Sequence, residues 1–325
     1  MSPAPLLAFR PVSVVHRLAP RSQACPLSLR DLLRAQGGSR RPLPIVGAPQ
    51  AGLARAVLLA AQQAGAAVGL RLPAGRAPEP WFDALTRSAD ELAPRLPFFL
   101  SGDVVVEAGE GGAERAARRA WRLVEAGFTH LAVDVSRVAV AERARAAAQV
   151  AGFAVEREIA VELLLPEGAA PPGAEEAVAF QEELEGWGLR PDALGLRLPA
   201  PDGAEGLRDQ ARALAGLSSA LGRTALIRRG PVTPVLLQVL RAAGVAAAED
   251  GGRVEAAGLA ALPEAARRAW EGPEERGAGE PPLEPAAAAR LEALAFAEAL
   301  AVIEALGAGG SAAALAARLA APGSR

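Results

Sequence analysis

Polar side chains end several short apolar segments of this sequence, and these are the residues best placed to do chemistry. The positions are Gln50, Arg71, Asp103, Asp134, Glu156, Glu158, Arg197, Arg228 and Arg229. A carboxylate can act as a general base once its surroundings raise its pKa, and a guanidinium can hold a phosphate or carboxylate through two hydrogen bonds. The set predicts either a pocket for an anionic small molecule or a network of salt bridges that neutralise one another.

The pair Arg228 and Arg229 gives the most specific signal of an anion site. Both follow an apolar segment and precede a helical pattern that begins near Val232. Barrel enzymes often bind phosphate at a helix N-terminus in this position, and Gly230 leaves the backbone open to a close approach. We therefore expect an anion to bind at these residues.

Carboxylates at two other places are candidate bases. Glu156 and Glu158 lie two residues apart in a strand-like segment, so they share one face of it; that face points either into a barrel or outward into solvent. Asp103 ends a very apolar segment and is expected at the same mouth or as a loop acceptor. His130 begins an apolar segment, at the end opposite the expected site, which favours a surface or packing role.

The residue types that are missing exclude whole classes of chemistry. The chain has no Lys, so all 35 basic residues are Arg and neither a Schiff base nor a P-loop lysine is possible. The histidines are His16 and His130, and the single cysteine is Cys25. A zinc site of the usual three or four His and Cys ligands cannot be assembled from them.

Composition indicates a globular protein. The chain is 51% hydrophobic, and its net charge of -2 comes from interspersed signs, which argues against nucleic acid and membrane partners. The Ala and Arg usage is typical of a GC-rich bacterial genome. Residues 1–26 form an arm with several Arg and no acid, expected to be disordered although it resembles a transit peptide. This region contains no continuous apolar h-region of the kind that a secretory signal needs, so we expect a cytoplasmic location.

Strand-like and helical patterns alternate from residue 43 onward. The predicted strands are 43–47, 66–72, 97–101, 130–136, 153–159, 192–198, 224–229 and 244–249, and the predicted helices are 51–64, 80–94, 112–126, 137–151, 174–186, 203–221 and 232–243. Eight such units predict a (β/α)₈ TIM barrel over 27–271, with an open doubly wound sheet as the alternative. The segment 166–173 is a loop at the expected site. A linker and helical tail (284–306 and 310–320) make up 272–325.

Four segments carry a resemblance to a known family: EAGFTHLAVDVS (125–136), FAVEREI (153–159), AEEAVAFQEELEGWGLRPDALGL (174–196) and ALIRRGPVTPVLLQVLRAAGV (225–245). In order and spacing they resemble class II ketose-bisphosphate aldolases, a family that includes fructose- and tagatose-bisphosphate aldolases and non-catalytic partner subunits. The resemblance covers roughly residues 27–250. It implies an aldolase-like barrel, carbohydrate metabolism and a sugar-phosphate ligand.

The departures from the family fall at its zinc ligands. The family's Leu-Asp-His reads Gly102-Asp103-Val104 here, which keeps the acid and loses the ligand. Its second histidine region reads Arg197-Leu198-Pro199-Ala200, and its third histidine corresponds to Ile227. The resemblance therefore implies a degenerate member that lacks the zinc-binding histidines, so that no zinc polarises the substrate.

These observations lead to one expectation and two alternatives. The expectation is a diverged barrel, such as a pseudo-enzyme, that binds a phosphorylated or carboxylated small molecule. The first alternative is a non-catalytic structural or regulatory subunit. The second is an active carbon-carbon lyase with a carboxylate-bound metal. No zinc is expected, and carboxylates would suit Mg²⁺. The candidate catalytic residues are Asp103, Glu156 and Glu158. The candidate substrate or phosphate-binding residues are Arg71, Asp134, Ser136, Arg197, Arg228, Arg229 and Gly230. A homo-oligomer through the C-terminal helices is also expected.

Overall fold

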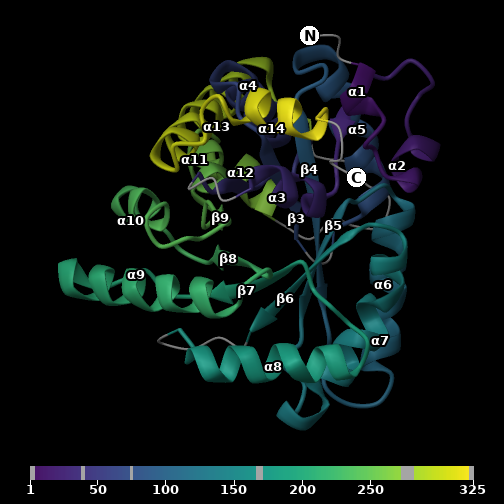
Figure 1. Ribbon diagram of the computed structural model, residues 1–325. Coiled ribbons are helices and arrows are strands. Elements are labelled where there is room, and N and C mark those ends of the chain that lie inside the picture. The colour runs from purple at the N-terminus through teal and green to yellow at the C-terminus, as the bar shows by residue number, and fades with distance from the viewer. Residues whose placement is uncertain (1–3, 38–40, 74–75, 166–170, 272–281, 322–325) are drawn as a thin grey trace.

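The fold is a closed parallel barrel with helices around it, seen in a computed structural model that describes residues 4–37, 41–73, 76–165, 171–271 and 282–321 (Figure 1). The barrel strands are β2 (Leu43–Gly47), β3 (Val68–Leu72), β4 (Pro97–Val105), β5 (His130–Asp134), β6 (Ala160–Leu165), β7 (Ala193–Arg197), β8 (Ala225–Arg229) and β9 (Ala247–Glu249). Each pairs in parallel with the next, β9 pairs with β2, and the ring closes. The prediction of a (β/α)₈ TIM barrel with extra C-terminal helices is confirmed.

Helices follow the strands and cover the outside of the barrel. They are α4 (Ala51–Ala64), α5 (Pro78–Leu92), α6 (Gly112–Glu125), α7 (Arg143–Glu156), α8 (Ala174–Gly186), α9 (Gly203–Ala220), α10 (Pro234–Leu240), α11 (Arg253–Ala260) and α12 (Glu264–Glu271). A short 3₁₀ turn, Val140–Glu142, precedes α7. The bounds of α4 and α8 are those that the helical periodicity predicts.

The predicted strand 153–159 is wrong. Helix α7 runs through Glu156, and the chain then turns at Glu158, which has a φ of +60°, before β6 begins at Ala160. Apolar residues at 153, 155 and 159 imitate a strand, but Phe153 and Val155 belong to the last turn of α7 and Ile159 follows that helix. The real strand is the next six residues, whose near-continuous apolar run is typical of a strand buried on both faces.

The barrel interior has two halves. At the amino ends of the strands, Ile45, Phe99, Ile227 and their neighbours form an apolar cluster closed from below by residues such as Leu29. Side chains alternate along a strand, so the next inward positions toward the carboxyl ends follow at intervals of two. Those positions carry the charged residues, and the fold therefore collects them in one half of the barrel.

The N-terminal arm packs against the barrel, in contrast to the disorder expected for it. It contains α1 (Ala4–Leu7), α2 (Val12–Arg17) and the short strand β1 (Cys25–Pro26), which pairs with β4. Val14 of α2 is fully buried, and Arg17 pairs with Asp83 of α5 at 2.9 Å. The helix α3 (Leu29–Gln36) then crosses below the strands.

The C-terminal helices α13 (Pro285–Ala305) and α14 (Ser311–Leu319) pack on the same chain. Helix α13 lies against α4 and α11, and α14 lies against α3, as Figure 1 shows in yellow. The predicted linker at 272–283 falls mostly outside the described residues. The predicted subunit contact through the tail stays a prediction; Leu294 is the large apolar residue that α13 leaves exposed. No helix in the described ranges is long and apolar enough to cross a bilayer.

Candidate functional site

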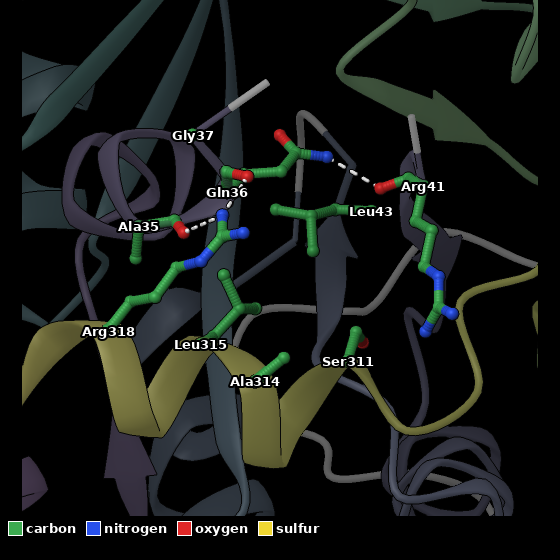
Figure 2. Close-up of a pocket in the computed structure, with 9 residues that line it drawn as sticks. All are labelled: Ala35, Gln36, Gly37, Arg41, Leu43, Ser311, Ala314, Leu315 and Arg318. Carbon is green, nitrogen blue, oxygen red and sulfur yellow. Dashed lines mark hydrogen bonds between the residues drawn. The ribbon is translucent and has the colours of Figure 1, made fainter. Parts of the chain in front are cut away.

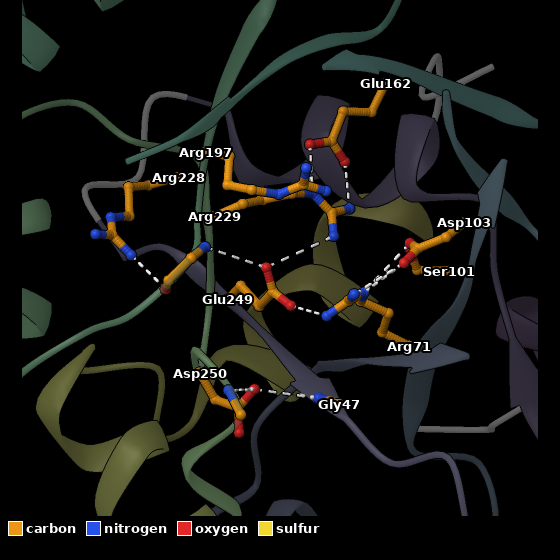
Figure 3. Close-up of polar contacts among 12 residues, drawn as sticks. Gly47, Arg71, Ser101, Asp103, Glu162, Arg197, Arg228, Arg229, Glu249 and Asp250 are labelled. Atoms are coloured by element: carbon orange, nitrogen blue, oxygen red, sulfur yellow. Dashed lines mark hydrogen bonds and ion pairs between the residues drawn. The ribbon is translucent and has the colours of Figure 1, made fainter. Parts of the chain in front are cut away.

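The charged half of the barrel interior forms the candidate site, at the carboxyl ends of the strands where barrel active sites lie (Figure 3). Its members, called the mouth network below, are Arg71, Ser101, Asp103, His130, Asp134, Glu162, Arg197, Arg229 and Glu249. Seven of the eight barrel strands contribute, since these residues come from β3 to β9. The network has a deep part and a rim.

The deep part is a buried ion pair between Glu162 and Arg229. The Nε and Nη2 groups of Arg229 donate to the two carboxylate oxygens at 2.7 and 2.5 Å, and both side chains are almost completely buried. Burial alone would raise the pKa of Glu162, but Arg229 outweighs it and lowers that pKa to about 2. The same pair raises the pKa of Arg229 against the effect of its burial. Both groups are therefore charged at neutral pH.

His130 lies beside this pair inside the barrel. Its Nδ1 is 3.0 Å from the Ser101 hydroxyl and its Nε2 is 3.3 Å from a Glu162 oxygen. The expectation of a ring outside the site at the opposite end is wrong, although the side chain is buried as a packing role requires. Closed barrels stagger their strands, and the first residue of β5 pairs in register with Ser101, the fifth residue of β4.

The rim is made of two arginine–carboxylate groups that solvent reaches. Arg71 donates to Asp103 at 2.9 Å and also pairs with Glu249. Arg197 pairs with Asp134 at 3.2 Å. The side chains of Arg71 and Arg197 are 22% and 36% exposed, against 2% for Arg229, so the rim guanidiniums are the accessible ones.

Glu249 joins the rim to the deep pair. One of its oxygens pairs with Arg71, while the other lies 3.9 Å from Arg229 and accepts the Gly230 N–H at 3.3 Å. The Gly230 backbone, expected to approach an anion, is thus occupied by a protein carboxylate. A side chain at Gly230 would also meet the Leu198 carbonyl at 2.8 Å. The backbone at Gly230 is therefore not open to a ligand in this structure.

Arg228 precedes Arg229 on β8, so its side chain points to the other face of the strand and lies in a different environment. Its guanidinium donates to the carbonyls of Gly230, Leu198 and Pro199, and the residue is fully buried. Burial lowers the pKa of Arg228 to about 10, and the charge of Glu249 offsets only part of this effect. Both residues of the predicted anion site are therefore enclosed by protein acceptors, and anion binding by them stays a prediction that would require these contacts to rearrange.

The other predicted residues divide between the mouth and the opposite end. Asp103 and Asp134 lie at the rim as expected, and the Ser136 N–H donates to Asp134 at 2.9 Å. Glu156 and Glu158 are wrong as mouth residues: both are exposed, and they precede β6 at its amino end. The Glu158 carbonyl accepts from Ser28, just before α3, which confirms that position.

The sequence analysis missed Glu162, Glu249 and Asp250. Glu162 is the lone acid in the apolar run AVELLL, and Glu249 and Asp250 end an alanine-rich run; a single acid in such a run was the available signal. Asp250 is fully buried and accepts the N–H groups of Gly47, Gly252 and Val254. Its burial raises the pKa of that carboxyl to about 6.

The residues do not fit a metal centre of the usual kind. No cluster of three or more His, Cys, Asp or Glu side chains arranged to hold a metal occurs among the residues that the structure describes. The four carboxylates of the mouth network each face a guanidinium. A divalent cation would have to displace an arginine to bind any of these carboxylates.

Comparisons with known proteins support the fold. The structure is similar to the YdjI aldolase from Escherichia coli K12, with a TM-score of 0.65 and 16% identity over 88% of this chain and 98% of that one. It is also similar to a protein from Coccidioides immitis assigned as a fructose-1,6-biphosphate aldolase, with a TM-score of 0.64 and 17% identity over 91% and 99%. No family model matches this sequence, and a search of curated protein sequences returns no match. At these identities the likeness establishes an aldolase-like barrel fold.

Proposed function

We propose that this protein is a diverged aldolase-like barrel that binds a phosphorylated or carboxylated small molecule of the sugar-phosphate class at its mouth, without zinc-dependent aldol cleavage. The similarity in fold to two aldolases supports the general class. The observation that carries the proposal is the partial exposure of Arg71 and Arg197 at the carboxyl ends of β3 and β7.

The two rim arginines are suited to an anion because their guanidiniums are partly exposed to solvent at the mouth. A guanidinium carries several N–H donors, and Arg197 contacts Asp134 at 3.2 Å. A phosphate that reaches the mouth can bind at these exposed groups without breaking the deep pair. A charge-assisted hydrogen bond of this kind contributes about 1.5–3 kcal/mol.

The proposed absence of aldol chemistry rests on residue types. Cleavage of a ketose bisphosphate needs a group that stabilises the enediolate, either a Lewis acid or a Schiff base. The chain has no Lys, and His130 is engaged by Ser101 and Glu162. Asp103 and Asp134 remain as rim groups able to accept a proton from a bound ligand.

Titration calorimetry with fructose 1,6-bisphosphate and with inorganic phosphate tests the binding. We expect Arg71→Gln and Arg197→Gln each to weaken sugar-phosphate binding by about tenfold or more, from the energy of one charge-assisted contact. Arg212→Gln is the matched control, because Arg212 lies on the exposed face of α9 and pairs with Asp209 three residues away. Equal affinity in all four proteins would refute the site.

Elemental analysis tests the zinc proposal separately. We expect no stoichiometric zinc in the purified protein and no zinc-dependent cleavage of fructose or tagatose bisphosphate. One zinc per chain would overturn the proposal. The Mg²⁺ alternative is tested in the same way: Mg²⁺ that raises activity and binds less well after Asp103→Asn would favour an active lyase.

A non-catalytic structural or regulatory subunit is the second candidate. The sealed pair of Glu162 and Arg229 favours it, since it fills the centre of the barrel with charges that already satisfy each other. Failure of every sugar phosphate to bind would support this reading. Sedimentation of the parent and of Leu294→Glu tests the proposed contact through α13; monomers in both cases would contradict a homo-oligomer.

A further inference from the structure

A second arginine-rich site lies at the opposite end of the barrel from the mouth network (Figure 2). It is a cavity of about 380 Å³ between α3, the start of β2 and α14, called the basal groove below. The lining residues are Ala35, Gln36, Gly37, Arg41, Leu43, Ser311, Ala314, Leu315 and Arg318. This set contains two guanidinium groups and no carboxylate. A volume of this size lies within the range of small-molecule sites.

Arg41 forms one end of the groove. Its Nη1 donates to the Gly309 carbonyl at 3.2 Å, and the residue is exposed. This contact holds the guanidinium beside the first residue of α14, Ser311. The first N–H groups of α14 are already used, since Ser311 donates to the Ala308 carbonyl and Ala312 to the Gly65 carbonyl, so the charge available at this end is that of Arg41. An anionic group is favoured at this end of the groove.

Arg318 forms the other end. Its Nη1 donates to the Ala35 carbonyl at 2.9 Å and to the Gln36 carbonyl, at the carboxyl end of α3. No carboxylate pairs with Arg318 or Arg41 within the described part of the chain, and the Nε and Nη2 groups of Arg318 have no protein acceptor there. Donors of a charged group are thus available at this end too.

The space between the two guanidiniums is apolar. Leu43 and Leu315 are buried and form the floor, and Figure 2 shows them between the two arginines. Ser311 and Arg318 are seven residues apart on one helix, which corresponds to about 10 Å at roughly 1.5 Å per residue. The groove therefore offers two cationic ends and an apolar middle.

We propose that the basal groove binds a small molecule with two anionic groups joined by an apolar chain, such as a linear dicarboxylate. Each guanidinium then receives a carboxylate, and the chain covers Leu43 and Leu315. The described lining residues include no acid, which favours an anionic ligand over a cation or a neutral polyol. The site is independent of the mouth, since the apolar cluster of the lower barrel separates the two.

Titration calorimetry with linear dicarboxylates of four to ten carbons, at constant ionic strength, tests the proposal on the full-length chain. We expect saturable binding with an optimum chain length, at least tenfold tighter than that of the monocarboxylate of equal length. Arg41→Gln should weaken binding at least tenfold. Arg34→Gln is the matched control, because Arg34 lies on the same helix α3, is exposed and does not line the groove; it should leave the affinity unchanged.

Two further variants separate this site from the others. Arg318→Lys keeps the charge and a donor toward α3, and should weaken binding while the melting temperature stays within a few degrees of the parent's. Arg71→Gln, at the mouth, should bind the dicarboxylate as the parent does. Equal binding of mono- and dicarboxylates, no measurable binding at any length, or unchanged affinity in Arg41→Gln would overturn the proposal; loss of binding in Arg71→Gln would assign the dicarboxylate to the mouth instead.

Discussion

The two ends of the barrel use the same cation in opposite ways. At the mouth, Arg71, Arg197 and Arg229 each meet at least one carboxylate, so each guanidinium is paired within the protein. In the basal groove, Arg41 and Arg318 contact only carbonyl groups within the described residues. A buried, paired arginine holds strands together, and an exposed arginine without an acid is available to a ligand. In a chain without Lys, the surroundings of each Arg decide its role.

The largest expected effect is at the deep pair. Glu162→Gln leaves the buried Arg229 without its counter-charge, and breaking such a pair typically costs about 3–5 kcal/mol. Urea denaturation measures the loss in the free energy of unfolding. The double variant Glu162→Leu with Arg229→Met should lose less than Glu162→Gln alone, since it leaves no unpaired charge. Should the double variant be the less stable protein, the deep pair would be a net stabilising contact rather than a constraint.

A smaller loss in the free energy of unfolding is expected at Gly195, where the lack of a side chain leaves room for the Glu162–Arg229 pair. A side chain at Gly195 would lie 2.0 Å from Oε1 of Glu162, so Gly195→Ala must push the carboxylate away from Arg229. We expect a cost of about 1–3 kcal/mol, as in other overpacked cores. Gly216→Ala is the control, because the same added atom meets nothing within 4 Å in helix α9 and should be neutral or slightly stabilising. Equal effects of the two substitutions would contradict the crowding argument.

Asp250 lies beside the mouth network and has no cation partner among the described residues. Its contribution to the free energy of unfolding should change with pH in the opposite sense from that of Glu162. Burial raises the pKa of Asp250 to about 6, above its value of 3.8 in the unfolded chain. The native state therefore holds the proton more tightly, and stability rises as pH falls from 7.5 to 5, by about 1 kcal/mol. Glu162, with its pKa lowered to about 2, contributes stability above pH 4.5 that is lost only at more acid pH.

Urea denaturation of the parent and of Asp250→Asn at pH 7.5 and 5 measures this effect. The difference in unfolding free energy between the two proteins should change with pH in the stated direction. Parallel pH profiles for the parent and the variant would show that Asp250 does not titrate in this range.

The smallest effect is expected in the basal groove. Arg41→Gln removes one exposed contact to a carbonyl, so the free energy of unfolding should change by no more than about 0.5 kcal/mol. A loss comparable to that of Glu162→Gln would mean that Arg41 is part of the framework of the fold, and the contrast between the two ends would fail.

Much of the fold could be predicted from the sequence, because strand and helix periodicities are written in neighbouring residues. The helices at 51–64 and 174–186 match the predicted bounds. The rim residues Arg71, Asp103, Asp134 and Arg197 also follow from their place at strand ends. The prediction failed at 153–159, where a short polar–apolar alternation at the end of a helix has the same local pattern as a strand.

The error in the predicted strand at 153–159 also explains why the sequence predicts Glu156 and Glu158, rather than Glu162, as carboxylates of the site. With Glu156 and Glu158 predicted as strand residues, Glu162 falls between the predicted strand and the predicted loop at 166–173. A shift of this size also changes which face each residue presents, and only the position of β6 between β5 and β7 fixes it. The His130 ring was misplaced for a related reason, since the stagger between β4 and β5 is not encoded locally.

By itself, the sequence determined which chemistry is excluded and that strands and helices alternate eight times. The absence of Lys rules out a Schiff base whatever the fold, and two histidines with one cysteine are too few ligands for the usual zinc sites. The tertiary structure alone decided which charges meet. Glu162 and Arg229 are 67 residues apart and belong to strands that are not adjacent in the sheet. Closure and stagger of the barrel bring them together, because pairing across a ring depends on the geometry of all its strands rather than on neighbouring residues.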